Sequence, residues 1–192
     1  NVLDSTSNVR GNPYMIASVS GSCNAITTSG DYKLATFKGP GTFTVCSVAS
    51  CAADNAVEYI VVAGGAGSAS GGGGAGGFRF ASPSIAPLTY PAKPLAGPAG
   101  ITVTATGYPI TVGGGGTAAA PMACNGGDGN NSIFSTITST GGGGGGRANN
   151  NGTAGGSGGG AGYDRCAACT AAGNTPPVSP PQGNTGGSAP ST

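Results

Sequence analysis

The chain has 192 residues, of which 41 are glycine, 14 are proline and only 7% are charged, and its formal net charge is +1. An average protein contains about 7% glycine and about 25% charged residues. Near-neutral charge with scattered Lys and Arg argues against nucleic-acid binding, which needs clustered cations. No run of roughly 18 apolar residues is present, so no membrane-spanning helix is expected.

Residues 1–30 are rich in Ser, Thr and Asn and are predicted to form an N-terminal arm with one strand at 14–19. This strand either pairs within the fold or is donated to a neighbouring copy, because an open sheet edge accepts an added strand. Pairing within the fold is the favoured alternative. Tyr14, Ile16 and Val19 are the candidate assembly residues of a donated strand.

Residues 31–66 predict a small antiparallel unit that is similar to a β-sandwich. Alternating patterns at 32–37 and 42–45 flank a Gly-Pro-Gly turn, which is a hairpin signal. After a short loop at 46–51, the apolar run at 57–62 predicts a mostly buried strand.

Residues 67–172 form a glycine-rich region in which glycine runs alternate with short strands. The runs lie at 71–74, 113–116, 141–146 and 155–162, and strands are expected at 101–104, 108–112 and 132–137. One such run alone is typical of a flexible linker. Several runs packed side by side can instead hydrogen-bond laterally as extended threefold helices of polyglycine II type, which satisfies the backbone without a hydrophobic core.

Residues 173–192 predict a Pro/Gly-rich extended tail of polyproline type. A spacer is the favoured interpretation of this tail, and a proline-rich signalling ligand is the alternative. The predicted fold class is therefore all-β: a small antiparallel β-sandwich-like unit followed by a glycine-rich, polyglycine II-like packed region.

The cysteines are even in number and belong to a chain of low charge, which favours disulfides in an oxidising compartment. They are Cys23, Cys46, Cys51, Cys124, Cys166 and Cys169. Many connectivities are possible, and pairing of sequence neighbours is preferred: Cys46 with Cys51, Cys166 with Cys169, and the remaining Cys23 with Cys124. The chain begins with Asn1 instead of Met and shows no leader, as expected of a processed secreted protein or of a fragment.

Enzymatic and cofactor motifs are incomplete. The strand at 57–62 runs into glycines as in a dinucleotide site, but Ser70 replaces the third glycine, no helix follows, and the next acid is Asp128. The CxxC spacing of Cys166 and Cys169 lacks the histidines or further thiols of a zinc site and the βαβ setting of a redox site. Without His or paired carboxylates, we expect no catalytic residues, no metal and no cofactor.

Two kinds of surface residue are candidates for carbohydrate chemistry. Asn130 and Asn151 match the N-glycosylation acceptor pattern. Tyr90, Tyr108 and Tyr163 are candidate glycan contacts, because sugar sites commonly use aromatic platforms. Structural packing of these rings is the favoured alternative.

The order of motifs closely resembles the glycine-rich domain that is common in bacteriophage tail-fibre and virion structural proteins. The matching residues are 31–37, 41–45, 57–65 and 76–79, followed by 110–113, 129–134 and 173–177. The resemblance spans roughly residues 31–187. Relatives usually carry further glycine-rich sequence after the proline segment, so a missing or additional tail beyond Thr192 is an expectation.

This resemblance implies a non-enzymatic, self-assembling structural subunit of a fibre, with identical copies as partners. The alternative is a phage receptor-binding adhesin that recognises a cell-surface polysaccharide through exposed loops. A virion assembled in a reducing cytosol rarely carries so many cysteines. The expected location is therefore extracellular or on a virion surface, with weight on a secreted filament.

Overall fold

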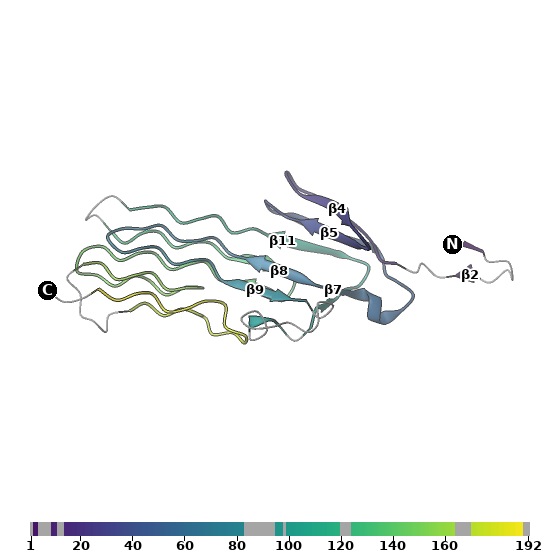
Figure 1. The fold of residues 1–192 in the computed structure, drawn as a ribbon. Helices are drawn as coiled ribbons and strands as arrows, with labels where there is room; N and C mark the ends of the chain where they lie inside the picture. The colour runs from purple at the N-terminus through teal and green to yellow at the C-terminus, as the bar shows by residue number, and fades with distance from the viewer. Residues whose placement is uncertain are drawn as a thin grey trace.

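The structure is a computed structural model that describes residues 2–3, 9–10, 14–82, 95–97, 99–119, 124–163 and 170–189. The described part is elongated. Strands gather at one end, and long extended segments run from them to the other end (Figure 1). Within the described ranges, the one helical element is the short 3-10 helix η1, Ala52–Asn55.

The strands form one five-stranded sheet and several two-stranded pairs. The large sheet has the order β13-β12-β11-β6-β3, with strands Ile137–Ser139, Ser132–Phe134, Gly107–Thr111, Gly41–Ser47 and Ile16–Val19. The pairs are β1–β2 (Val2–Leu3, Val9–Arg10), β4–β5 (Ala25–Ser29, Tyr32–Thr36), β8–β9 (Tyr59–Val62, Phe78–Ala81) and β10–β7 (Ile101–Thr102, Ala56–Val57). All these pairings are antiparallel, which confirms the predicted fold class.

A small hydrophobic core lies among the strands. Its buried members are Phe43, Val45, Val61, Val103 and Phe134. The Phe134 ring meets the Phe43 ring edge-on, with centroids 6.2 Å apart. Because burial of one such side chain contributes about 1.5–3 kcal/mol, this cluster stabilises the strand end of the molecule.

The hairpin predicted from the Gly-Pro-Gly turn is wrong. Strand β5 pairs with β4, which precedes it, while β6 pairs with β3 and β11. Gly30, at φ +56°, supplies the left-handed residue of the β4–β5 turn. The Asn24 side chain holds the connection from β5 to β6: its Oδ1 accepts from the backbone N–H of Lys38, and its Nδ2 donates to the carbonyl of Pro40.

The strand predicted at 57–62 is interrupted and is not mostly buried. It divides into β7 and β8 at Glu58. Along β8, Val61 is buried, whereas Ile60 is 72% exposed and Val62 is 53% exposed. The pair β8–β9 is therefore a ribbon with one side on the core and the other in solvent.

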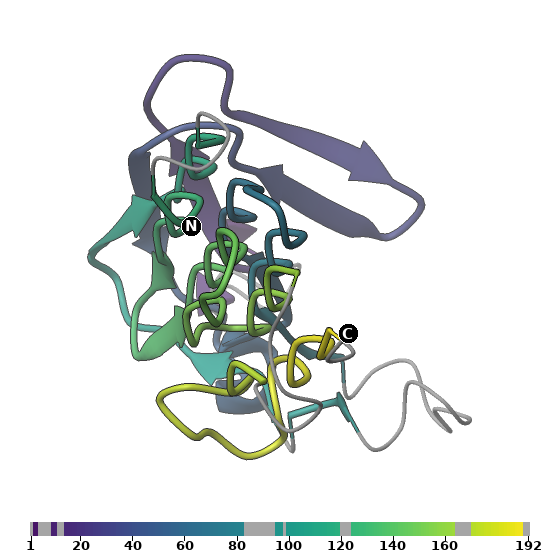
Figure 2. The same cartoon turned by 90° about the vertical axis from the view of Figure 1, so that its left-hand side faces the viewer.

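Extended glycine segments occupy the end of the molecule away from the strands, and some of them continue directly from a strand. They comprise residues 63–69, 71–77, 112–119, 124–131, 140–147, 150–156, 157–163, 170–175 and 182–189. Figure 2 looks along them, and several appear there as tight coils beside one another. We call the described segments together the glycine bundle.

The hydrogen bonds of the bundle repeat every third residue. The N–H groups of Gly142 and Gly145 donate to the carbonyls of Gly64 and Gly67, with N···O distances of 2.9 and 3.0 Å. The N–H groups of Gly143 and Gly146 donate to the carbonyls of Ser157 and Gly160, at 2.9 and 2.8 Å. A partner that recurs at every third residue is what an extended threefold helix requires.

Glycine is required in the bundle because the backbones approach too closely for side chains. A Cβ atom at Gly142 or Gly145 would lie 2.0 Å from a carbonyl oxygen of segment 71–77, and one at Gly141 would lie 1.8 Å from the carbonyl oxygen of Gly129. The glycine runs are therefore packed backbone, as the sequence predicts.

Candidate functional site

The central segment of the bundle, 140–147, is enclosed by other segments and by a row of side chains. The backbone N–H groups of Gly141, Gly144 and Arg147 donate to the side-chain oxygens of Asn131, Asp128 and Asn125 respectively, with distances of 2.9, 2.8 and 3.0 Å. These three acceptors, which we call the Asx row, occupy the position where a further extended segment would otherwise accept hydrogen bonds.

The Asx row also reaches the next segment, 150–156. The Thr153 hydroxyl donates to Oδ1 of Asp128, and Nδ2 of Asn125 donates to the carbonyl of Asn151 at 2.9 Å. Every backbone N–H and C=O from Gly141 to Gly146 consequently has a partner. The Asx row was not predicted from the sequence, although its three-residue spacing opposite a glycine run is a recognisable signal.

This arrangement stabilises the extended segments against one another. Its interactions are backbone hydrogen bonds, which contribute about 0.5–1.5 kcal/mol each and are costly to leave unpaired when buried. The segments reinforce one another because successive backbone groups of segment 140–147 are bonded to different neighbouring segments. The bundle can therefore stay ordered over its length without a hydrophobic core of its own.

The predicted assembly strand is β3, and it pairs within the chain. Ala17 lies opposite Val45, and Val19 lies opposite Phe43, which confirms the favoured alternative of intramolecular pairing. Val19 packs against the core, whereas Tyr14 and Ile16 are exposed. The three candidate residues thus do not share one face. Among the described strands, β3 is an edge strand of the large sheet.

The predicted disulfides are not formed among the described cysteines. Cys23, Cys46, Cys51 and Cys124 are free and exposed. Cys46 lies on β6, and its Sγ is 3.9 Å from the Ser18 hydroxyl instead of bonding Cys51. The pair Cys23–Cys124 is not formed because Cys23 lies between β3 and β4, whereas Cys124 begins a segment at the bundle end farthest from the strands. Cys166 and Cys169 lie outside the described residues.

The candidate glycan tyrosines do not form one platform. The Tyr108 ring meets Phe134 edge-on at 6.3 Å, and its hydroxyl accepts from the Thr104 backbone N–H at 2.8 Å. Hydrogen bonding to the Thr104 hydroxyl, and then to this N–H, lowers the pKa of the Tyr108 phenol. Tyr163 is 46% exposed at the opposite end of the bundle. Tyr90 lies outside the described residues.

Both candidate glycosylation residues present exposed side chains on the bundle. The backbone of Asn130 is bonded on both sides, to the Gly114 carbonyl and to the Gly64 N–H, while its side chain is exposed. The Asn151 side chain is also exposed. Their modification stays a prediction.

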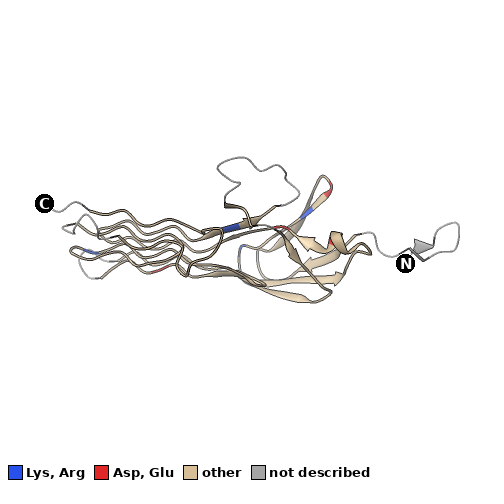
Figure 3. Cartoon of the chain, turned by 90° about the horizontal axis from the view of Figure 1, so that it is seen from below, with Lys and Arg blue, Asp and Glu red and all other residues tan. Residues whose placement is uncertain are grey.

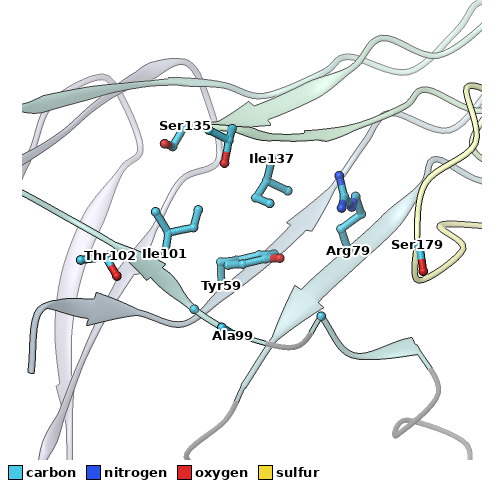
Figure 4. A pocket seen from close by; sticks show the side chains of 11 residues that line it. Tyr59, Arg79, Ala99, Ile101, Thr102, Ser135, Ile137 and Ser179 are labelled. Atoms are coloured by element: carbon cyan, nitrogen blue, oxygen red, sulfur yellow. The ribbon is translucent and has the colours of Figure 1, made fainter. Parts of the chain in front are cut away.

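A pocket of about 450 Å³ lies beside the β8–β9 ribbon, β10 and the turn between β12 and β13. Figure 4 shows the side chains of Tyr59, Arg79, Ile101 and Ile137 gathered in it, with hydroxyl groups such as those of Ser135 and Ser179 at its margin. An aromatic ring, a guanidinium and several hydroxyl groups therefore line one cavity.

Arg79 is the one charged side chain in the lining. Its Nη1 donates to the carbonyl of Thr138 at 3.3 Å. A guanidinium binds carboxylates in a planar, two-bonded geometry. Arg79 therefore gives the pocket lining a cationic group with hydrogen-bond donors.

The described residues contain no cluster of metal-ligating side chains. No helix in the described ranges is long and apolar enough to cross a membrane.

A family model described as a glycine-rich domain matches residues 37–192, from the residue after β5 through the whole bundle. No match was found among curated proteins or among solved structures.

Proposed function

We propose that this chain, which belongs to the glycine-rich domain family, is a non-enzymatic, self-assembling structural subunit of an extracellular or virion-surface fibre. The observation that carries the proposal is the glycine bundle, in which the backbone of segment 140–147 is bonded on all sides. Such a bundle holds a rod together while leaving few side chains for chemistry.

The charge distribution supports association between copies. Within the described bundle segments only Asp128 and Arg147 are charged, and Figure 3 shows that Lys, Arg, Asp and Glu are sparse along the bundle. A net charge near zero promotes association, and uncharged surfaces come together without the cost of removing ions from water. The resemblance to tail-fibre domains favours a fibre as the product.

Electron microscopy and sedimentation velocity of the purified chain test this function. We expect filaments or defined oligomers whose fraction rises with protein concentration. A Gly145→Ala variant, which opens the bundle, should lose them. A chain that remains monomeric at every concentration, up to the millimolar range, contradicts the proposal.

The second candidate function is recognition of a surface polysaccharide, and the pocket around Tyr59 and Arg79 favours it. An acidic oligosaccharide such as tetragalacturonate is the probe, with a neutral tetrasaccharide for comparison. We expect calorimetric binding of the acidic probe that falls at least about tenfold in Arg79→Gln, from the loss of a charge-assisted pair. Lys33→Gln is the matched control, since it removes an exposed charge on β5. Absence of binding, or an equal loss in both variants, contradicts it.

A further inference from the structure

The dipeptide Asn-Gly occurs twice in the chain, at 125–126 and at 151–152. An asparagine in this setting can react with its own backbone, because the following glycine has no Cβ atom to shield its nitrogen. The glycine nitrogen bonds to the side-chain amide carbon, the bond from that carbon to the side-chain nitrogen breaks, and ammonia leaves with the glycine's amide proton. Water then opens the cyclic imide: breaking the new bond gives aspartate, and breaking the original peptide bond gives isoaspartate.

The bundle holds the reacting groups of the first dipeptide in hydrogen bonds. Gly126 is buried, and its N–H donates to the carbonyl of Gly145 at 2.9 Å. The Asn125 side chain is bonded at both ends: Oδ1 accepts from the Arg147 N–H at 3.0 Å, and Nδ2 donates to the carbonyl of Asn151 at 2.9 Å. Ring closure at Asn125 therefore needs a local opening of the bundle that breaks these three bonds.

The second dipeptide has the same reacting groups without such bonds. The Asn151 side chain is exposed and forms no hydrogen bond with any residue that the structure describes. The Gly152 N–H likewise has no partner in the described ranges. The peptide between these two residues is held through the Asn151 carbonyl, which accepts from Asn125 and takes no part in the attack. Ring closure at Asn151 thus disturbs one side-chain hydrogen bond, whereas ring closure at Asn125 breaks three.

We propose that Asn151 is a site of spontaneous deamidation, and that Asn125, in the same dipeptide, is protected by the folded bundle. The two sites share the residue types that react, so the difference between them comes from the tertiary structure, which sets how often each site opens. Both products place a new carboxylate on the bundle, whose described segments otherwise carry only Asp128 and Arg147 as charged residues.

The isoaspartyl product also changes the main chain of segment 150–156, because it adds one carbon to the backbone at position 151. On one side of this position the Asn150 carbonyl accepts from Gly162 at 2.9 Å. On the other side the Thr153 N–H donates to the carbonyl of Gly144 at 2.9 Å. A longer main chain between these two anchors shifts the threefold repeat, so we expect the isoaspartyl form to pack less well on segment 140–147.

Peptide mass spectrometry of the aged full chain tests the inference. The chain is produced in a host without N-glycosylation and incubated at mildly alkaline pH, where loss of the glycine's amide proton speeds the attack. Trypsin cleaves after Arg147, so the two dipeptides fall on different peptides, and fragmentation identifies the modified residue. A parallel incubation in guanidinium chloride gives the rates without the fold. Asn151→Gln is the control variant, because its longer side chain closes a ring more slowly and its exposed position should leave the fold intact.

The comparison of the two sites gives the result. In the folded chain we expect deamidation to be at least about tenfold faster at Asn151 than at Asn125, because reaction at Asn125 has to await local opening. In guanidinium chloride the two rates should be similar, and Asn151→Gln should remove the modification at position 151. Equal rates in the folded chain, or a faster rate at Asn125, overturn the inference. An unmodified Asn151 in the folded chain also overturns it, whether or not guanidinium chloride restores the reaction.

Discussion

Gly145→Ala should destabilise the bundle strongly, because Gly145 lies in its most enclosed segment. The new Cβ would stand 2.0 Å from the carbonyl oxygen of Gly71, whereas real Cβ contacts are essentially never under 3.0 Å. Segments 140–147 and 71–77 must therefore separate by about 1 Å. The bonds from Gly71 to Gly146 and from Gly74 to Gly143, now 2.7 and 2.8 Å, would then exceed hydrogen-bonding distance.

The expected magnitude follows from these two bonds. A buried backbone group left unpaired costs about 1–3 kcal/mol, so the substitution should cost about 2–6 kcal/mol. This is a large fraction of the roughly 5–15 kcal/mol by which a domain is stable. For a chain of this length the loss corresponds to a decrease in Tm on the order of 10 °C.

Gly72→Ala is the matched control in the neighbouring segment. Its Cβ would meet nothing within 4 Å, so we expect no loss and a gain of about 0.4–1 kcal/mol from the restricted unfolded chain. Differential scanning calorimetry compares the two variants with wild type. Equal Tm values for Gly145→Ala and Gly72→Ala would falsify the close backbone packing described above.

Other variants probe separate parts of the structure. Asp128→Ala should lower the free energy of unfolding in urea by about 1–3 kcal/mol, because the backbone N–H of Gly144 loses its acceptor. Asp128→Asn keeps a side-chain oxygen and should recover most of that stability. Equal losses in the two variants would contradict the role of the Asx row. Phe134→Ala should cost about 3–5 kcal/mol, against under about 1.5 kcal/mol for the half-exposed Phe78→Ala, and the reverse order would place the core elsewhere. Thr104→Val should raise the pKa of Tyr108 in an ultraviolet titration, since the Thr104 hydroxyl lowers it in the folded state; an unchanged titration curve would refute that cause.

The fold class and the packed glycine runs follow from the sequence because both depend on local patterns. Alternation identified the strands around Val45 and Ile110, and repeated glycine runs between strands indicated lateral packing. Strand partners were harder to predict. The Gly-Pro-Gly turn suggested a hairpin between the strands on either side of it. In the structure the hairpin turn is the one at Gly30, between β4 and β5, and the Asn24 side chain bonds the backbone of the connection from β5 to β6. A side chain that bonds a distant backbone leaves no periodic signal.

The candidate sites were less accessible to sequence reasoning for the same reason. Tyr108 has the residue type of a sugar platform, but its hydroxyl is bonded to Thr104 and its ring packs in the sheet. Tyr59 and Arg79 meet in one pocket only because β8 and β9 pair across the bundle segments that separate them in sequence. Burial and the choice of hydrogen-bond and packing partners depend on the tertiary structure, and residue type alone does not reveal them.

The direct continuation of β8, β11 and β13 into glycine segments makes the length of this molecule adjustable in fixed steps. One residue inserted into a threefold helix turns everything beyond it by a third of a revolution and disrupts the bonds to all neighbours. Three residues restore the phase and add about 9 Å, at 3.1 Å per residue. Family members can therefore lengthen or shorten the rod by whole turns in facing segments while the strand end stays unchanged.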